Sequence, residues 1–201
     1  MISCANLVKY EFDTEQQKRE PNLKPESSEI ERRAARIKLL LMDCDGVLTD
    51  GRLLLLENGD EQKTFHVRDG QGIKLFHRAG LKTGIISGRT SSATQRRAGE
   101  LEITHVRQYA GDKIEAFDEL LLQANVPVHE CAFIGDDIAD IPLMRRVEFA
   151  VAVADAVAET KQAAHYVTEQ KGGHGAVREV TDLILKAQGR WNELMKPYVS
   201  G

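Results

Sequence analysis

Two aspartates of this chain, Asp43 and Asp45, stand one residue apart directly after the apolar run Leu39 to Met42. Side chains alternate along a strand, so both carboxylates share one orientation if the chain stays extended through Cys44. Two such charges repel each other unless a cation or a proton lies between them. A divalent metal with oxygen ligands would keep one carboxylate ionised as a nucleophile while the other holds a proton, as an aspartyl-phosphate mechanism requires.

The D-x-D-G motif also has structural interpretations. A calcium loop of the EF-hand type needs an oxygen ligand at loop position 5 and glycine at position 6. Counting from Asp43 places Gly46 at position 4 and Val47 at position 5, which excludes that loop. A pair of acids at an ordinary strand-to-turn junction stays open for the motif alone.

Three further segments place polar groups directly after an apolar run or at a helix start. A hydroxyl with free backbone N–H groups suits a phosphate oxygen, an ammonium group attracts an anion, and acids extend a metal site. Taken singly, each is also typical of a turn, a solvated lysine or a helix N-terminus. The segments are Ser87-Gly88-Arg89, Lys113, and Asp136-Asp137 with Asp140 three residues later.

In this order, D-x-D-G, S-G-R, a lone lysine and G-D-D-x-x-D resemble the haloacid dehalogenase superfamily of phosphotransferases. More narrowly, about residues 37–189 are similar to the 3-deoxy-D-manno-octulosonate 8-phosphate phosphatase family, through residues 43–51, 66–73, 135–140 and 172–179. The resemblance implies an α/β fold with a Rossmann-like doubly wound, mostly parallel sheet. It also implies a β-hairpin flap in place of a large cap domain, and a homotetramer.

The resemblance implies catalytic roles for four residues. Asp43 would attack phosphorus and form the aspartyl-phosphate, while Asp45 would protonate the leaving sugar alkoxide and later activate water. Ser87 and Lys113, with the Gly88 backbone, would position the phosphoryl group and neutralise its charge.

Cofactor and substrate contacts follow from the same resemblance. Mg²⁺ would be held by Asp43, the backbone carbonyl of Asp45, and Asp136, with Asp137 orienting these ligands. The sugar acid also carries a carboxylate, so its binding would require further positively charged side chains. The implied substrate-binding residues are Asp45, His66, Val67, Arg68, Asp69, Gly70, Lys74, Gly88, Arg89, Arg97 and Lys113.

The implied activity is that of a Mg²⁺-dependent phosphomonoesterase, which releases phosphate and the free sugar acid in lipopolysaccharide precursor synthesis. Two departures bear on the sugar: Ser87 replaces a frequent Thr, and Lys74 replaces a frequent Arg and lacks its bidentate fork. A nine-carbon sialic-type acid 9-phosphate is therefore an alternative substrate. A non-catalytic binding or scaffold protein on the same fold is an alternative of another class.

Other enzyme classes fail on spacing. No cysteine has the arginine that a Cys-x5-Arg phosphatase needs, and the chain lacks G-x-x-x-x-G-K-[ST], G-x-S-x-G and H-E-x-x-H. Leu75 occupies the third glycine position of a dinucleotide-binding motif begun by Gly70 and Gly72.

Length and composition indicate one domain. The chain has 201 residues, 42% of them hydrophobic, and a net charge of -4, which gives no reason to expect nucleic-acid binding. Three scattered cysteines favour a reducing compartment. No apolar run reaches membrane-spanning length and the N-terminus lacks a signal-peptide core, so we expect a cytoplasmic protein without membrane contact.

Three regions divide the chain. We expect a mobile leader over residues 1–27, the phosphatase domain over 28–189 and a C-terminal tail over 190–201. Ser28 to Glu31 match a capping box, which predicts the start of a short helix. The alternation of later elements predicts right-handed crossovers and a mostly parallel sheet. Strands are expected near 81–86, 103–106, 131–134, 148–153 and 165–168, and helices near 71–79, 90–100, 112–123, 137–146, 156–164 and 175–187.

Asn58-Gly59 is a strong hairpin signal between strand-like runs at 52–57 and 62–67. Leu53 to Leu56 are more apolar than a solvated hairpin requires, so one side is expected against another subunit or against the same chain.

Two predictions concern basic and glycine-rich segments. Arg89 and Arg97 are eight residues apart and are expected on one helix face. Gly172-Gly173-His174-Gly175, with Arg178, is expected to complete the substrate site, on a neighbouring subunit; an ordinary loop before a helix is the alternative.

Overall fold

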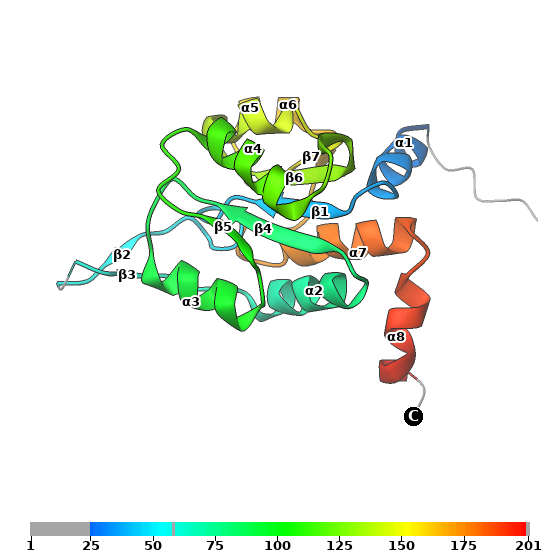
Figure 1. Ribbon diagram of the computed structural model, residues 1–201, viewed down its shortest axis with the longest axis horizontal. Helices are drawn as coiled ribbons and strands as arrows, with labels where there is room; N and C mark the ends of the chain where they lie inside the picture. Colours follow the sequence, from blue (N-terminus) through cyan, green and yellow to red (C-terminus); the bar gives the residue numbers. More distant parts are fainter. Residues whose placement is uncertain (1–24, 58, 200–201) are drawn as a thin grey trace, which may run out of the picture.

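The computed structural model describes residues 25–57 and 59–199, so most of the expected leader lies outside the described residues. Its main sheet has six strands in the order β5-β4-β1-β6-β7-β8, all paired in parallel, with helices on both faces (Figure 1). The expected fold class is confirmed, and no large cap domain is present among the described residues. The strands are β1 (Leu39–Met42), β4 (Lys82–Ile86), β5 (His105–Arg107), β6 (Cys131–Gly135), β7 (Phe149–Ala152) and β8 (Tyr166–Val167).

The strand order changes direction next to β1. The chain leaves β1 for β4 and β5 on one side and then returns to β6, β7 and β8 on the other. Met42 is paired with both Ile85 and Ile134, so β1 ends level with its two neighbours. Open α/β sheets bind ligands in the crevice at such a switch point, beyond the carboxyl ends of the strands.

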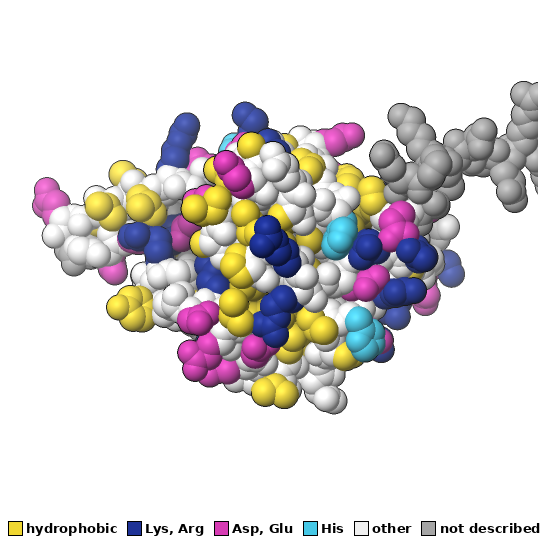
Figure 2. All heavy atoms as spheres, turned by 90° about the horizontal axis from the view of Figure 1, so that it is seen from above, with side chains coloured by type: hydrophobic (Ala, Val, Ile, Leu, Met, Phe, Trp, Pro, Cys, Tyr) yellow, Lys and Arg dark blue, Asp and Glu magenta, His cyan; other side chains and the backbone are white. Residues whose placement is uncertain are grey.

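Helices cover both faces of this sheet. In Figure 1, α4, α5 and α6 lie above it, and α2, α3 and α7 lie below. The bounds are α2 (Val67–Arg78), α3 (Ser92–Glu100), α4 (Lys113–Ala124), α5 (Ile141–Met144), α6 (Ala158–Ala163) and α7 (Ala176–Ala187), with 3-10 turns η1 (Val128–Glu130) and η2 (Ile138–Asp140). Figure 2 shows the face above the sheet, where Lys, Arg, Asp, Glu and hydrophobic side chains are interspersed.

The core is built from the strands and one face of each long helix. Every residue of β1 and β7 is buried, which explains why these strands read as continuous apolar runs rather than alternating ones. Helices α2 and α7 pack closely because Gly72 has no side chain; a Cβ there would lie 3.1 Å from the Cα of Arg178.

The hairpin is shorter than expected. Strands β2 (Leu54–Leu55) and β3 (Glu61–Gln62) pair antiparallel and project from the body (Figure 1), while Val67, expected in the second strand, begins α2. Leu53 to Leu56 are 42–68% exposed, and hydrophobic side chains lie along the projection in Figure 2. The alternative that these leucines are buried on their own chain is therefore wrong. A two-stranded sheet that does not pack on other elements is only marginally stable, which explains why few residues of the two strands pair.

Both ends of the described chain are helical. Helix α1 (Pro25–Ala34) begins before Ser28, so the expected capping box is wrong and the 27/28 boundary falls inside a helix; proline is favoured in a first helical turn. The expected tail contains α8 (Trp191–Val199), whose Trp191 ring lies beneath the Arg178 guanidinium at 5.8 Å. No helix in the described part of the chain is long and apolar enough to cross a membrane.

Candidate active site

Asp43 follows β1 directly, but the chain does not stay extended beyond it. Residues 44–49 form a tight turn in which the Cys44 carbonyl accepts hydrogen bonds from the N–H groups of Leu48 and Thr49, at 3.0 and 3.1 Å. Gly46 has a φ of 91°, a backbone conformation that is unfavourable for any residue with a side chain. The shared orientation expected for Asp43 and Asp45 is therefore wrong, and the two carboxylates contact different cations.

The Asp43 carboxylate belongs to a cluster of acids at the switch point. Carboxylate oxygens of Asp43, Asp136 and Asp140 lie within 4.8 Å of one another. Asp136 follows β6, the neighbour of β1, and Asp140 ends the 3-10 turn η2. Asp140 is fully buried and accepts a hydrogen bond from the Asp136 backbone N–H at 3.0 Å. The motif G-D-D-x-x-D includes Asp140, but no catalytic, metal-binding or substrate-binding role was predicted for it.

One cation of the described residues enters this cluster from α4, which lies on the same face of the sheet as α5. Lys113, the first residue of α4, places its Nζ 2.7 Å from Asp140 and 3.2 Å from Asp43. Burial lowers the pKa of Lys113, but the charges of Asp43 and Asp140 outweigh it, so the pKa is raised and the lysine stays charged. The structure thus brings Asp43, Lys113 and Asp136 together.

Three carboxylates share this single ammonium group, and their ionisation is costly. Burial, with the charge of Asp140, raises the pKa of Asp43 to about 6. Burial, with the charges of Asp43 and Asp140, raises the pKa of Asp136 to about 7. One oxygen of Asp136 is buried without a hydrogen-bond partner among the described residues. When all three carboxylates are ionised, their charges and that of Lys113 sum to -2, which a hard divalent cation with oxygen ligands balances.

Asp137 supports the cluster from outside. Its side chain accepts a hydrogen bond from the Ile138 N–H at 2.7 Å and forms a reciprocal capping box with Asp140. This capping fixes the turn that carries Asp140, which agrees with the orienting role implied for Asp137.

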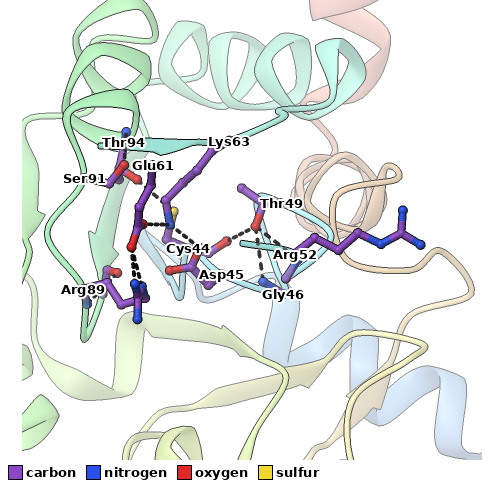
Figure 3. Close-up of polar contacts among 12 residues, drawn as sticks. Cys44, Asp45, Gly46, Thr49, Arg52, Glu61, Lys63, Arg89, Ser91 and Thr94 are labelled. Atoms are coloured by element: carbon purple, nitrogen blue, oxygen red, sulfur yellow. Dashed lines mark hydrogen bonds and ion pairs between the residues drawn. The ribbon is translucent and has the colours of Figure 1, made fainter. Parts of the chain in front are cut away.

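The Asp45 carboxylate contacts a second group of charges (Figure 3). It forms an ion pair with Lys63, whose Nζ also lies 3.5 Å from Glu61. Glu61 in turn accepts a hydrogen bond from Arg89 Nε at 3.0 Å, and this bond lowers the pKa of Glu61. Lys63 and Glu61 come from the hairpin, and sequence reasoning missed both.

Ser87 and Gly88 lie at the end of β4, beside β1. The Ser87 hydroxyl is buried and accepts a hydrogen bond from the Arg89 N–H at 3.2 Å. The expected helix over 90–100 begins at Ser92, because the Ser91 side chain accepts a hydrogen bond from Thr94 N–H and caps it. Arg89 therefore precedes the helix, and the expectation that it shares a helix face with Arg97 is wrong.

A hollow of about 450 Å³ gathers further residues expected to bind substrate, and no member of the Asp43 cluster lines it. Its lining combines residues of α2 between Val67 and Lys74 with Arg97 from α3, Leu101 and Arg178 from α7. Gly70 gives Arg97 room, since a Cβ at residue 70 would lie 3.3 Å from the Arg97 Cζ. The expected residues in this lining are Val67, Arg68, Gly70, Lys74 and Arg97.

His66 and Asp69 lie at the starts of two helices. His66 is the N-cap residue of α2, and its Nδ1 is buried without a partner among the described residues. The Asp69 carboxylate accepts hydrogen bonds from the N–H groups of Gly175 at 3.3 Å and Arg178 at 2.8 Å, so it caps the start of α7. Burial raises the pKa of Asp69. Substrate binding by these two residues remains a prediction.

The glycine-rich segment packs on its own chain. The Gly173 N–H donates to the Val47 carbonyl at 2.9 Å, and a Cβ at Gly173 would lie 2.5 Å from the Asp50 nitrogen. Gly173 and Gly175 have φ values of 67° and 110°, which explains the unusual glycine content.

Comparisons with known proteins agree with this geometry. Residues 105–180 match the haloacid dehalogenase-like hydrolase family. The chain is 45% identical over 166 residues to the 3-deoxy-D-manno-octulosonate 8-phosphate phosphatase of Yersinia pestis, covering 83% of this chain and 89% of that protein. A crystal structure of the Yersinia pestis phosphatase superimposes with a TM-score of 0.80, covering 82% of this chain and 89% of that one.

A second structure, from Moraxella catarrhalis, is the same phosphatase in complex with magnesium ion, phosphate ion and a KDO molecule. It is 38% identical, with a TM-score of 0.82, and the match covers 85% of this chain and 98% of that one. This chain belongs to the 3-deoxy-D-manno-octulosonate 8-phosphate phosphatase family of haloacid dehalogenase-like hydrolases.

Proposed function

We propose that the chain is a Mg²⁺-dependent phosphomonoesterase that hydrolyses 3-deoxy-D-manno-octulosonate 8-phosphate to the free sugar acid and phosphate. The observation that carries the proposal is the buried Asp43 carboxylate, held by Lys113 within an acidic cluster at the switch point of the sheet. The named activity of a relative that is 45% identical supports the substrate, and lipopolysaccharide precursor synthesis is the role we propose for the reaction.

Hydrolysis proceeds in two steps on this chain's own residues. The Asp43 carboxylate attacks phosphorus, the bond from phosphorus to the sugar oxygen breaks, and Asp45 gives its proton to the departing alkoxide. Water then attacks the aspartyl-phosphate while Asp45 takes the water's proton, which releases phosphate and regenerates Asp43. Lys113, Ser87 and the Gly88 backbone hold the phosphoryl oxygens, because charge spreads over all three of them in the transition state.

Asp43, Asp136 and the backbone carbonyl of Asp45 would hold Mg²⁺, and Asp140 lies close enough to join them or to orient Asp136. The bound ion would supply positive charge opposite the phosphoryl oxygens. The unpartnered oxygen of Asp136 and the single ammonium among three carboxylates fit such an ion.

Recognition of the sugar acid rests on cations around the cluster. Arg89 and the hollow lined by Arg68, Lys74 and Arg97 supply positive charge for the substrate carboxylate. His66, Val67, Asp69 and Gly70 would shape the same end of the site. Gly173 packs on the turn of Asp45, and Arg178 lines the hollow of the same chain. We therefore infer that Gly172 to Gly175 and Arg178 complete the site of their own subunit rather than that of a neighbouring subunit.

The finer organisation is also part of the proposal. The exposed leucines of the hairpin support a homotetramer. The buried, unbridged thiols of Cys44 and Cys131 support a cytoplasmic location. Residues 28–189 would act as the phosphatase domain, between a leader over 1–27 and a tail over 190–201.

A nine-carbon sialic-type acid 9-phosphate is the alternative substrate, and the named relatives do not favour it. A non-catalytic scaffold is disfavoured because Asp43, Asp45, Lys113 and Asp136 are all retained.

A panel of sugar phosphates tests the proposal. Purified protein with Mg²⁺ is assayed for released phosphate on the eight-carbon and nine-carbon sugar acid phosphates, a hexose 6-phosphate and p-nitrophenyl phosphate. We expect the highest kcat/KM on the eight-carbon substrate. A higher kcat/KM on the nine-carbon ester would identify that ester as the substrate instead. No phosphate release from any ester would refute the enzyme assignment.

A further inference from the structure

The Lys63 side chain is unusual because it is charged and almost completely buried. It comes from the hairpin, immediately after β3, yet only 1% of it is exposed. Its Nζ lies between the carboxylates of Asp45 and Glu61 (Figure 3). The neighbouring leucines of the same hairpin are exposed, so the burial of Lys63 is specific to this position.

Burying an ammonium group costs several kcal/mol unless carboxylates compensate it. Here the charges alternate along one path: Asp45, Lys63, Glu61 and Arg89, two negative and two positive. With Asp45 ionised, as it is after it has given its proton to the leaving oxygen, the four charges sum to zero and the path needs no further counter-ion. Its two ends are Asp45, the proposed acid and base, and Arg89, two residues beyond Ser87.

The two aspartates of the D-x-D-G motif are held in different ways. Asp43 accepts a hydrogen bond from the Cys44 N–H at 2.7 Å and contacts Lys113. For Asp45, the ion pair with Lys63 is the one hydrogen-bonding contact of the carboxylate within residues 25–57 and 59–199. The turn fixes the Asp45 backbone, so Lys63 is the group that selects its side-chain direction.

We propose that Lys63 is a positioning residue that holds the Asp45 carboxyl group where it can exchange a proton with the leaving oxygen and with water. The inference rests on the proposed function, since it concerns the acid and base of that reaction. It assigns the hairpin a role in catalysis, because Lys63 and Glu61 both belong to it. Glu61, restrained by Arg89, keeps Lys63 in place.

The test compares Lys63→Met, which keeps the length of the side chain but removes its charge, with Lys63→Arg and with Lys38→Met. Lys38 also forms an ion pair, with Glu130 at 2.8 Å, but it is 61% exposed and lies at the end of β1 opposite to the motif, so its variant is the matched control. Each protein is assayed with Mg²⁺ on the eight-carbon sugar acid phosphate and on p-nitrophenyl phosphate, after its melting temperature has been measured.

We expect Lys63→Met to lower kcat on the sugar ester by roughly 10- to 100-fold with KM changed less than about threefold, the loss typical of a misplaced catalytic group. The loss on p-nitrophenyl phosphate is expected to be smaller, because its leaving group departs without a proton. Lys63→Arg should recover part of the kcat, and Lys38→Met should match the wild type.

A double variant separates positioning from general stability. If Lys63 acts through Asp45, then adding Lys63→Met to Asp45→Asn should change kcat by less than about twofold, because the group that Lys63 positions is already lost. Equal multiplicative losses in both backgrounds would overturn the proposal, as would wild-type kcat in Lys63→Met. Should Lys63→Met not fold, Lys63→Gln takes its place with the same expectations. Wild-type protein that releases no phosphate from either ester would instead refute the proposed function and this inference with it.

Discussion

The Cα of Gly172 packs directly against the carbonyl group of Gly46, so closely that a Cβ at residue 172 would lie 2.6 Å from the carbonyl carbon and overlap its oxygen. The contact joins the glycine-rich segment to the turn that carries Asp45. The partner atoms are backbone, which cannot rotate away as a side chain can. The position of the Asp45 turn therefore depends on the absence of a side chain at residue 172.

We accordingly expect Gly172→Ala to lower kcat by roughly tenfold or more, because the turn must shift to admit the methyl group. Gly99→Ala is the matched control: Gly99 lies in α3, with no atom within 4 Å of an added Cβ. Steady-state kinetics and melting temperatures of both variants provide the measurement. Wild-type kinetics in Gly172→Ala would show that the turn tolerates this displacement.

The charge cluster predicts an opposition between activity and stability. Asp43→Asn should abolish turnover, since an amide cannot form the acyl-phosphate. The same change should stabilise the metal-free protein at pH 7.5. Burial raises the pKa of Asp43 from 3.8 to about 6, so folding favours the protonated acid. The stability that Asp43 contributes is complete below pH 4 and is lost as the pH rises through about 6.

Melting temperatures measured in chelator from pH 5 to 8 test this sign. As the pH rises, the melting temperature of the wild type should drop below that of Asp43→Asn. The difference should be roughly 2–4 °C for each kcal/mol by which the free energies of unfolding differ. Added Mg²⁺ should raise the melting temperature of the wild type more than that of the variant. A gap that narrows with rising pH would contradict the burial of a charged Asp43.

Local sequence patterns could predict the sheet and most of the cluster, because the carboxyl ends of neighbouring parallel strands meet at one edge. Asp43 and Asp136 follow β1 and β6, which pair directly, and Lys113 begins the helix that precedes β6. Each of these positions is fixed by its own strand or helix. Knowing the elements was therefore enough to bring these residues together.

The second charge group could not be predicted in this way. Asp45 points elsewhere than Asp43 because the chain turns at Cys44, and Lys63 reaches it from a hairpin whose path no local pattern specifies. Arg89 precedes α3 because Ser91 caps that helix. These contacts depend on tertiary packing and on the details of single turns.

Divalent metal is expected to be required for turnover. A chelator should stop hydrolysis, Mg²⁺ should restore it, and Ca²⁺ should substitute poorly because it prefers more ligands at longer distances. Asp136→Asn should raise the Mg²⁺ concentration for half-maximal activity by roughly tenfold or more. Asp118→Asn, at an exposed acid that pairs with Arg146, is the control. Undiminished activity in excess chelator would rule out the metal site.

The exposed hairpin predicts self-association. Leu55→Asp places a charge on a side chain that is 68% exposed in the single chain, and it should shift the protein toward the 22.4 kDa monomer. Leu122→Asp changes an even more exposed leucine on α4 and should leave the assembly unchanged. Sedimentation velocity distinguishes the two outcomes, and a monomeric wild type would remove the hairpin as a subunit contact.

Gly70 offers a test of substrate recognition that leaves the reacting groups untouched. A methyl group at residue 70 would lie 3.3 Å from the Arg97 Cζ and overlap its guanidinium, the movable end of a long side chain. Alanine is also favoured over glycine inside a helix, so the fold should survive and Arg97 should move.

If Arg97 binds the carboxylate of the sugar acid, Gly70→Ala should raise KM for the eight-carbon substrate by roughly tenfold, which corresponds to the loss of a charge-assisted hydrogen bond. The KM for p-nitrophenyl phosphate, which has no carboxylate, should stay within about twofold of the wild type, and Gly99→Ala should change neither value. Equal increases on both substrates would mean that residue 70 affects the phosphate site, and unchanged values on both would exclude Arg97 from sugar recognition.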